Sequence, residues 1–132
     1  MAWNIKPSSE EIAFLMEAGF VLKDAKRFEQ AEEVFKGVRA LVPQNEVPEA
    51  ALGAVCLDQG KLEEAIKHYK KALELNPKSA YAHAQLAEAY LFKHDKAAAK
   101  QEWKVALELD PKGDIGKLAR AYIEAAETVV FK

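Results

Sequence analysis

The side chains of this sequence that could do chemistry are few, and their spacing does not favour a reaction centre. The three histidines are His68, His83 and His94, and no acidic residue or cysteine accompanies them at the spacing of metal ligands. We therefore expect solvated or half-buried histidines and no metal site. Cys56 is the single cysteine, and no neighbouring charge in the sequence would lower the pKa of its thiol. We expect it to be a small buried hydrophobe.

The remaining candidates for catalysis have simpler interpretations. The segment Gly113-Asp114-Ile115-Gly116 holds the closest glycine pair and matches no phosphate-binding loop. Carboxylate pairs such as Glu32-Glu33 and Glu63-Glu64 stand on helix faces that we expect to be solvated. The hydroxyl side chains suit helix caps and turns. The sequence therefore predicts no catalytic residue, no cofactor and no enzymatic activity. The hydroxyl residues are Ser8, Ser9, Ser79 and Thr128.

Composition and charge narrow the class of partner. The chain has 132 residues, with 19 Lys and Arg against 21 Asp and Glu, for a net charge of −2. A nucleic acid would find no basic field on such a protein. The longest apolar run, Ala50–Leu57, is far shorter than the roughly 20 residues of a membrane span. The amino-terminal segment has no signal-peptide pattern, so we expect a cytoplasmic protein without membrane insertion.

A period of 34 residues organises the chain. Pro43, Pro77 and Pro111 are separated by 34 residues each, and three further columns keep the same step. Such self-similarity is typical of repeat architectures, in which each repeat is one supersecondary unit. The further columns are Ala31, Ala65 and Ala99; Phe35, Tyr69 and Trp103; and Val38, Ala72 and Ala106.

Within each period, the apolar spacing predicts two helices. A first helix, here called helix A, ends in a turn that Gly60 marks best, and a second, helix B, ends before the proline. Apolar residues at helical spacing continue after Pro111 and predict a seventh helix over 114–131. The fold class is therefore all-α. The expected A helices are 12–22, 49–57 and 81–92, and the expected B helices are 28–41, 62–75 and 96–109.

The units resemble the tetratricopeptide repeat, whose pattern runs W-x2-L-G-x2-Y, then A-x3-F, then P. The second unit has Leu52-Gly53, Ala65, Tyr69 and Pro77, whereas the first signature column holds Leu15, Glu49 and His83 instead of tryptophan. The resemblance implies a right-handed α-solenoid of three helix-turn-helix units with a capping helix. The implied boundaries are an arm at 1–11, repeats at 12–45, 46–79 and 80–113, and a capping helix at 114–132.

Charge is distributed unequally between the two kinds of helix. Each B helix holds five or six charged residues, whereas each A helix holds one. In the family that the sequence resembles, helix A lines the concave surface, and most of the corresponding positions are apolar here. We interpret them as a partner-binding groove, although a narrower open face would make them ordinary core. The predicted groove residues are Ala13, Met16, Phe20, Val47, Ala50, Ala54, Leu57, Tyr81, Ala84, Glu88 and Leu91.

The same resemblance tests one known binding mode. Some family members hold a terminal carboxylate of their ligand between Lys, Asn and Arg side chains of helix A. The matching positions hold no cation, so an acidic carboxyl-terminal tail is disfavoured and an apolar peptide or helix is the expected ligand. The matching residues are Met16, Phe20, Ala51, Tyr81 and Gln85.

Two functions follow from such a groove. One is a scaffold or adaptor that docks a partner protein through an apolar segment. The other is a small chaperone, because 26–31, 52–55 and 60–62 are similar to the tetratricopeptide chaperones of type III secretion. We also expect self-association, because apolar residues at both ends could fill a neighbour's groove. These are Trp3, Ile5, Val129, Val130 and Phe131.

Overall fold

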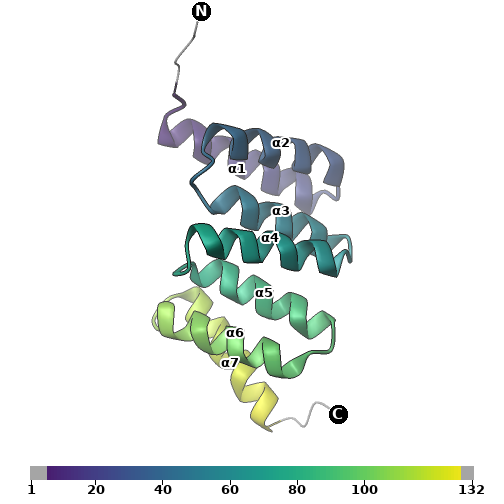
Figure 1. The fold of residues 1–132 in the computed structure, drawn as a ribbon, viewed down its shortest axis with the longest axis vertical. Coiled ribbons are helices and arrows are strands. Elements are labelled where there is room, and N and C mark those ends of the chain that lie inside the picture. Colours follow the sequence, from purple (N-terminus) through teal and green to yellow (C-terminus); the bar gives the residue numbers. More distant parts are fainter. Residues whose placement is uncertain (1–5, 129–132) are drawn as a thin grey trace, which may run out of the picture.

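A computed structural model describes residues 6–128, with the Thr128 side chain excepted, and this part of the chain is entirely helical between its turns. Consecutive helices form antiparallel hairpins that lie one above another from the amino-terminal to the carboxyl-terminal end (Figure 1). The all-α repeat solenoid predicted from the sequence is confirmed. The helices are α1 Ser9–Asp24, α2 Phe28–Leu41, α3 Val47–Asp58, α4 Leu62–Leu75, α5 Ala80–Phe92, α6 Lys96–Leu109 and α7 Asp114–Thr128.

The B helices α2, α4 and α6 begin and end where the sequence predicts. The A helices begin earlier, because local caps reach further back than the apolar pattern. Ser8 and Glu11 form a reciprocal capping box, so α1 begins at Ser9, within the predicted arm. Pro48 occupies the first turn of α3, where the missing backbone N–H is no loss. The boundaries of the 34-residue units themselves stay a prediction.

The turn inside each hairpin keeps one backbone geometry in all three units. Lys26, Gly60 and His94 are 34 residues apart, and their φ angles are 63°, 76° and 65°. Only glycine adopts this left-handed conformation without strain. The turn is therefore conserved in shape even where the sequence has lost the glycine.

The A helices lie on the inner side of the stack. Besides their sequence neighbours, α1 contacts α3, α3 contacts α5 and α5 contacts α7, whereas the B helices α2, α4 and α6 make no contact with one another. Helices that touch on one side and separate on the other give a curved stack. The surface of α1, α3 and α5 is therefore the concave surface.

The repeated columns form the core. Ala31, Ala65 and Ala99 are completely buried, which lets helices A and B of a unit approach closely. The aromatic column fills the space toward the next unit: the Tyr69 ring is buried, and its hydroxyl donates to Oε1 of Gln85 at 3.1 Å. Among the described helices, none has the length and apolar character to cross a membrane.

Candidate functional site

An apolar cavity opens on the concave surface between α1 and the start of α3. Its volume is about 660 Å³, and predicted groove residues Ala13, Met16, Phe20 and Val47 line it together. These four come from two repeats, so the cavity exists only because the first two units are stacked. The full lining is Pro7, Ser9, Ile12, Ala13, Met16, Glu17, Phe20, Val42, Asn45, Val47 and Pro48.

The residues that line this cavity differ in how deeply they are buried. Met16 is buried and forms part of the floor, and the Phe20 ring meets that of Phe35 edge to face, with centroids 5.1 Å apart. Val47 is 40% exposed, and its backbone N–H donates to Oδ1 of Asn45 at 2.8 Å, which fixes the start of α3. The Val47 and Ala13 side chains are thus accessible, whereas Met16 and Phe20 also hold the fold together.

The other predicted groove residues present less surface. Ala50, Ala54 and Ala84 are buried, so they can act only as the floor of a groove. The larger side chains beside them are half-buried and pack partly against the core of their own units. Beyond the cavity, the apolar surface is therefore narrower than the sequence suggests. These half-buried residues are Leu57, Tyr81 and Leu91.

A charged group lies beside the half-buried tyrosine Tyr81. The ammonium of Lys23 donates to Oδ2 of Asp58 at 2.8 Å and lies 3.4 Å from Oδ1 of Asp24. Burial, together with the nearby charge of Asp58, raises the pKa of Glu88 above its usual value, and Lys23 opposes this only in part. Within residues 6–128, the Glu88 carboxylate has no hydrogen bond or ion pair. The concave surface thus combines an apolar cavity, whose rim includes the exposed Glu17, with the half-buried and unpaired carboxylate of Glu88.

The positions that hold a ligand's terminal carboxylate in some tetratricopeptide-repeat proteins are not arranged to bind an acidic tail here. Ala51 is completely buried, and Gln85 already accepts a hydrogen bond from Tyr69. The charge of Lys23 acts on Tyr81 and Glu88, and two aspartates occupy its ammonium.

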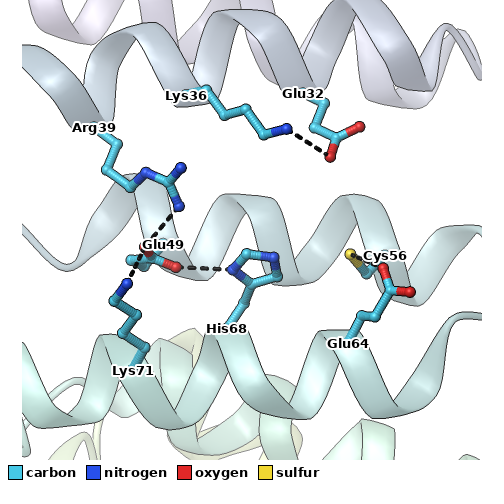
Figure 2. Close-up of polar contacts among 8 residues, drawn as sticks. All are labelled: Glu32, Lys36, Arg39, Glu49, Cys56, Glu64, His68 and Lys71. Carbon is cyan, nitrogen blue, oxygen red and sulfur yellow. Dashed lines mark hydrogen bonds and ion pairs between the residues drawn. The ribbon is translucent and has the colours of Figure 1, made fainter.

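A buried carboxylate, Glu49, lies on the opposite side of α3, and its position in the repeat does not by itself predict this burial (Figure 2). Glu49 is 1% exposed, and two cationic side chains and one imidazole surround it. Arg39 of α2 donates to Oε1 at 2.9 Å, His68 Nδ1 of α4 donates to Oε2 at 2.8 Å, and Lys71 Nζ lies 3.8 Å from Oε1. Burial alone would raise the pKa of Glu49, but the hydrogen bonds from His68 and Arg39 hold it below its usual value. Glu49 thus joins the first two repeats.

The third unit repeats this pair with the two residue types exchanged. His83 Nδ1 lies 2.6 Å from Oε2 of Glu102, and both residues are 34 positions after Glu49 and His68. The sequence did carry a signal, because two columns 19 residues apart hold Glu with His and then His with Glu. The family pattern describes each column separately, so it does not show that these two columns form a pair.

The candidate nucleophile Cys56 lies among the buried residues of α3. Cys56 is buried, as predicted, and burial followed by the charges of Glu64 and Glu32 raises the pKa of its thiol. No group of three potential metal ligands assembles in the part of the chain that the structure describes. The predicted self-association residues Trp3, Ile5 and 129–131 lie outside the described residues.

Comparison with known proteins supports the repeat interpretation. Residues 53–92 match the family model of the TPR repeat, the tetratricopeptide repeat that the sequence resembles. A comparison with curated protein sequences gives no match. The repeat that was recognised from its spacing is thus confirmed in the middle of the chain.

Solved structures share this fold along nearly the whole chain. The type III secretion translocator chaperone SycD of Yersinia enterocolitica, in an alternative dimer, superposes with a TM-score of 0.81 at 22% identity, covering 95% of this chain and 98% of its own. SycD with a peptide of the translocator YopD gives 0.77 at 22%, covering 91% and 95%. The first TPR of Spaghetti (RPAP3), bound to the HSP90 peptide SRMEEVD, gives 0.77 at 18%, covering 98% and 100%. At these identities the likeness establishes the fold.

Proposed function

We propose that this chain, a solenoid of the tetratricopeptide-repeat fold, binds an apolar segment of a partner protein on its concave surface as a scaffold or adaptor. The observation that carries the proposal is the apolar cavity of about 660 Å³ between α1 and α3. A cavity of this size accepts one or two large side chains of a peptide or helix. The molecule acts by binding, without catalysis, and a reducing cytoplasm suits its single buried cysteine.

The affinity must come from several anchors together. Each buried apolar side chain contributes roughly 1.5–3 kcal/mol, whereas association costs on the order of 4–15 kcal/mol. The cavity lined by Ala13 and Val47 supplies the first anchor position. The half-buried side chains of Leu57, Tyr81 and Leu91 continue the contact surface along α3 and α5.

Glu88 adds a polar preference to this surface. Its carboxylate is half-buried and unpaired, and its raised pKa shows that the protein alone does not fully compensate the charge. A partner that carries a Lys or Arg near its apolar anchors would supply the missing charge. We therefore expect the bound segment to be apolar and basic rather than apolar and acidic.

A second candidate is a small chaperone that shields a client's apolar segment. The support is the similarity of fold to SycD over 98% of that chain, together with the structure of SycD with a peptide of its translocator. The two candidates differ in the state of the partner. A chaperone forms a stoichiometric complex that keeps an otherwise insoluble client in solution, whereas a scaffold docks reversibly on a folded partner.

The test is a pull-down from the native lysate with mass spectrometry, followed by binding measurements with the recovered partner. The groove variant is Ala13→Glu with Val47→Glu, because both side chains are exposed and neither holds the core. Phe20→Asp is unsuitable, since it would remove the contact with Phe35. The matched control is Ala97→Glu with Leu118→Glu, on exposed positions of α6 and α7. The proposal predicts that only the groove variant loses the partner, and equal recovery by both variants would refute it.

A further inference from the structure

Two of the most exposed large apolar side chains stand at positions that are interior in the other repeats. Phe14 is 70% exposed and Val21 is 62% exposed, both on α1. Their equivalents 34 and 68 residues later are all buried. These equivalents are Pro48 and Val55 in α3, and Ala82 and Ala89 in α5.

In the second and third repeats, this face of helix A is covered by the B helix of the preceding unit. Val55 belongs to one apolar cluster with Phe35 and Val38 of α2. Ala82 and Ala89 belong to another cluster with residues of α4. Among the described residues no helix takes this place on α1, so the face around Phe14 and Val21 is a repeat interface that lacks its second half.

Charges of opposite sign flank the apolar stripe on α1. Glu10 stands at its beginning, and Lys26 and Arg27 stand in the turn that follows its end. All three side chains are exposed, and none has a hydrogen bond or ion pair within residues 6–128. The face is thus acidic at one end, apolar around Phe14 and Val21 and basic at the other end, with the exposed Glu17 on its edge toward the cavity.

We propose that a second copy of this chain covers this face, with the two α1 helices antiparallel about a two-fold axis near Ala18. This arrangement places Phe14 beside Leu22 of the other copy and brings the Glu10 end of each helix to the Lys26–Arg27 turn of the other. A two-fold interface must be complementary to itself, and the order of charges meets that requirement. A parallel pair would instead place Glu10 against Glu10.

The antiparallel arrangement also reproduces the packing within the solenoid. The helix that precedes an A helix runs antiparallel to it, as α2 does to α3, so the α1 helix of the second copy takes the place of a missing B helix (Figure 1). One helix pair is a small interface, at the low end for specific complexes. We therefore expect a dimer that dissociates on dilution.

Sedimentation velocity on the full chain over a dilution series tests this proposal. The wild type should shift from dimer to monomer on dilution, and Phe14→Glu with Val21→Glu should weaken dimerisation by more than about tenfold. Helical content should be unchanged, because both side chains are exposed. Phe92→Glu is the control, since this residue is 54% exposed but lies on α5.

A charge exchange tests the antiparallel register. Glu10→Lys alone and Lys26→Glu with Arg27→Glu should each weaken the homodimer, and an equimolar mixture of the two proteins should restore a heterodimer. A wild type that is monomeric at every concentration would overturn the proposal. A dimer that survives Phe14→Glu with Val21→Glu would also overturn it, since another surface would then hold the copies together.

Discussion

The imidazole Nδ1 of His68 lies 2.8 Å from Oε2 of Glu49, a carboxylate with 1% of its surface exposed. Because Arg39 of the first repeat holds the other oxygen, this one side chain connects helices of two units. The pair His83 and Glu102 connects α5 to α6 within the third unit, and Nε2 of His83 lies 2.9 Å from the carbonyl oxygen of Pro77 in the preceding loop. The junction between the first two repeats, which forms the cavity wall, therefore has a polar connection of its own.

Removing the charge of Glu49 should destabilise the protein. Glu49→Gln keeps the shape but leaves Arg39 and His68 without an anionic acceptor, and we expect a loss of about 1–3 kcal/mol in the free energy of unfolding. Urea denaturation measures this loss. Glu29→Gln is the control, because this carboxylate is exposed and has no partner in the described chain, and it should change stability by less than about 0.5 kcal/mol.

The first repeat suggests how the charged pair can be replaced. Its columns equivalent to Glu49 and His68 hold Leu15 and Val34. Glu49→Leu with His68→Val should therefore remain within about 1 kcal/mol of the wild type, because an apolar pair incurs no desolvation cost. The side chains of Arg39 and Lys71 are 35% and 65% exposed and can turn to solvent. A double variant less stable than Glu49→Gln in the same urea titration would contradict this account.

Stability should also fall at acidic pH through Glu49. Burial favours the protonated form, but hydrogen bonds from His68 and Arg39 hold the pKa of Glu49 below 4.5. The unfolded chain therefore takes up the proton at higher pH than the folded chain does, so the contribution of Glu49 is complete above about pH 4.5 and is lost as pH falls through the folded-state pKa. Urea midpoints of wild type and Glu49→Gln should differ by a constant amount from about pH 7 down to about pH 4.5. The difference should shrink as the pH falls further. A constant difference at every pH would count against this.

Replacing two helix-interior glycines by alanine should change the free energy of unfolding in opposite directions. A Cβ on Gly53 would stand 2.6 Å from Cε1 of Tyr69, whose buried ring is held by its hydroxyl bond to Gln85. Gly53→Ala should therefore lower the free energy of unfolding by about 1–3 kcal/mol. Gly37 has open space around it, so Gly37→Ala should raise it by about 0.5–1 kcal/mol. Thermal unfolding of the two variants separates packing from propensity, and a Gly53→Ala variant as stable as the wild type would show that the close approach of Tyr69 is unimportant.

The sequence predicts most of this fold because its signals are local and repeated. The B helices end before Pro43, Pro77 and Pro111, and their charged outer faces make the apolar stripe unambiguous. The beginnings of the A helices depend on caps such as Ser8, which lie outside the apolar pattern. The Glu49 site joins three helices, so its partners become neighbours only through packing. The exposure of Phe14 likewise depends on whether a helix stands before α1, and the residue type alone does not show this.

The turns offer the last prediction, since three residues share one left-handed backbone geometry, which is strained at Lys26 and His94. His94 has a φ angle of 65° at the position where the second repeat has Gly60 with a φ of 76°. A side chain in this region costs roughly 1–2 kcal/mol, so His94→Gly should raise the free energy of unfolding by about 1 kcal/mol, and Gly60→Ala should lower it by a similar amount. Nothing lies within 4 Å of a Cβ on Gly60, so any loss there comes from the backbone alone. Ala25→Gly is the control: its φ of −79° requires no glycine, so this substitution should be neutral or destabilising in the same urea titration. A stabilising Ala25→Gly would show that flexibility, and not relief of the left-handed strain, explains the gain at His94.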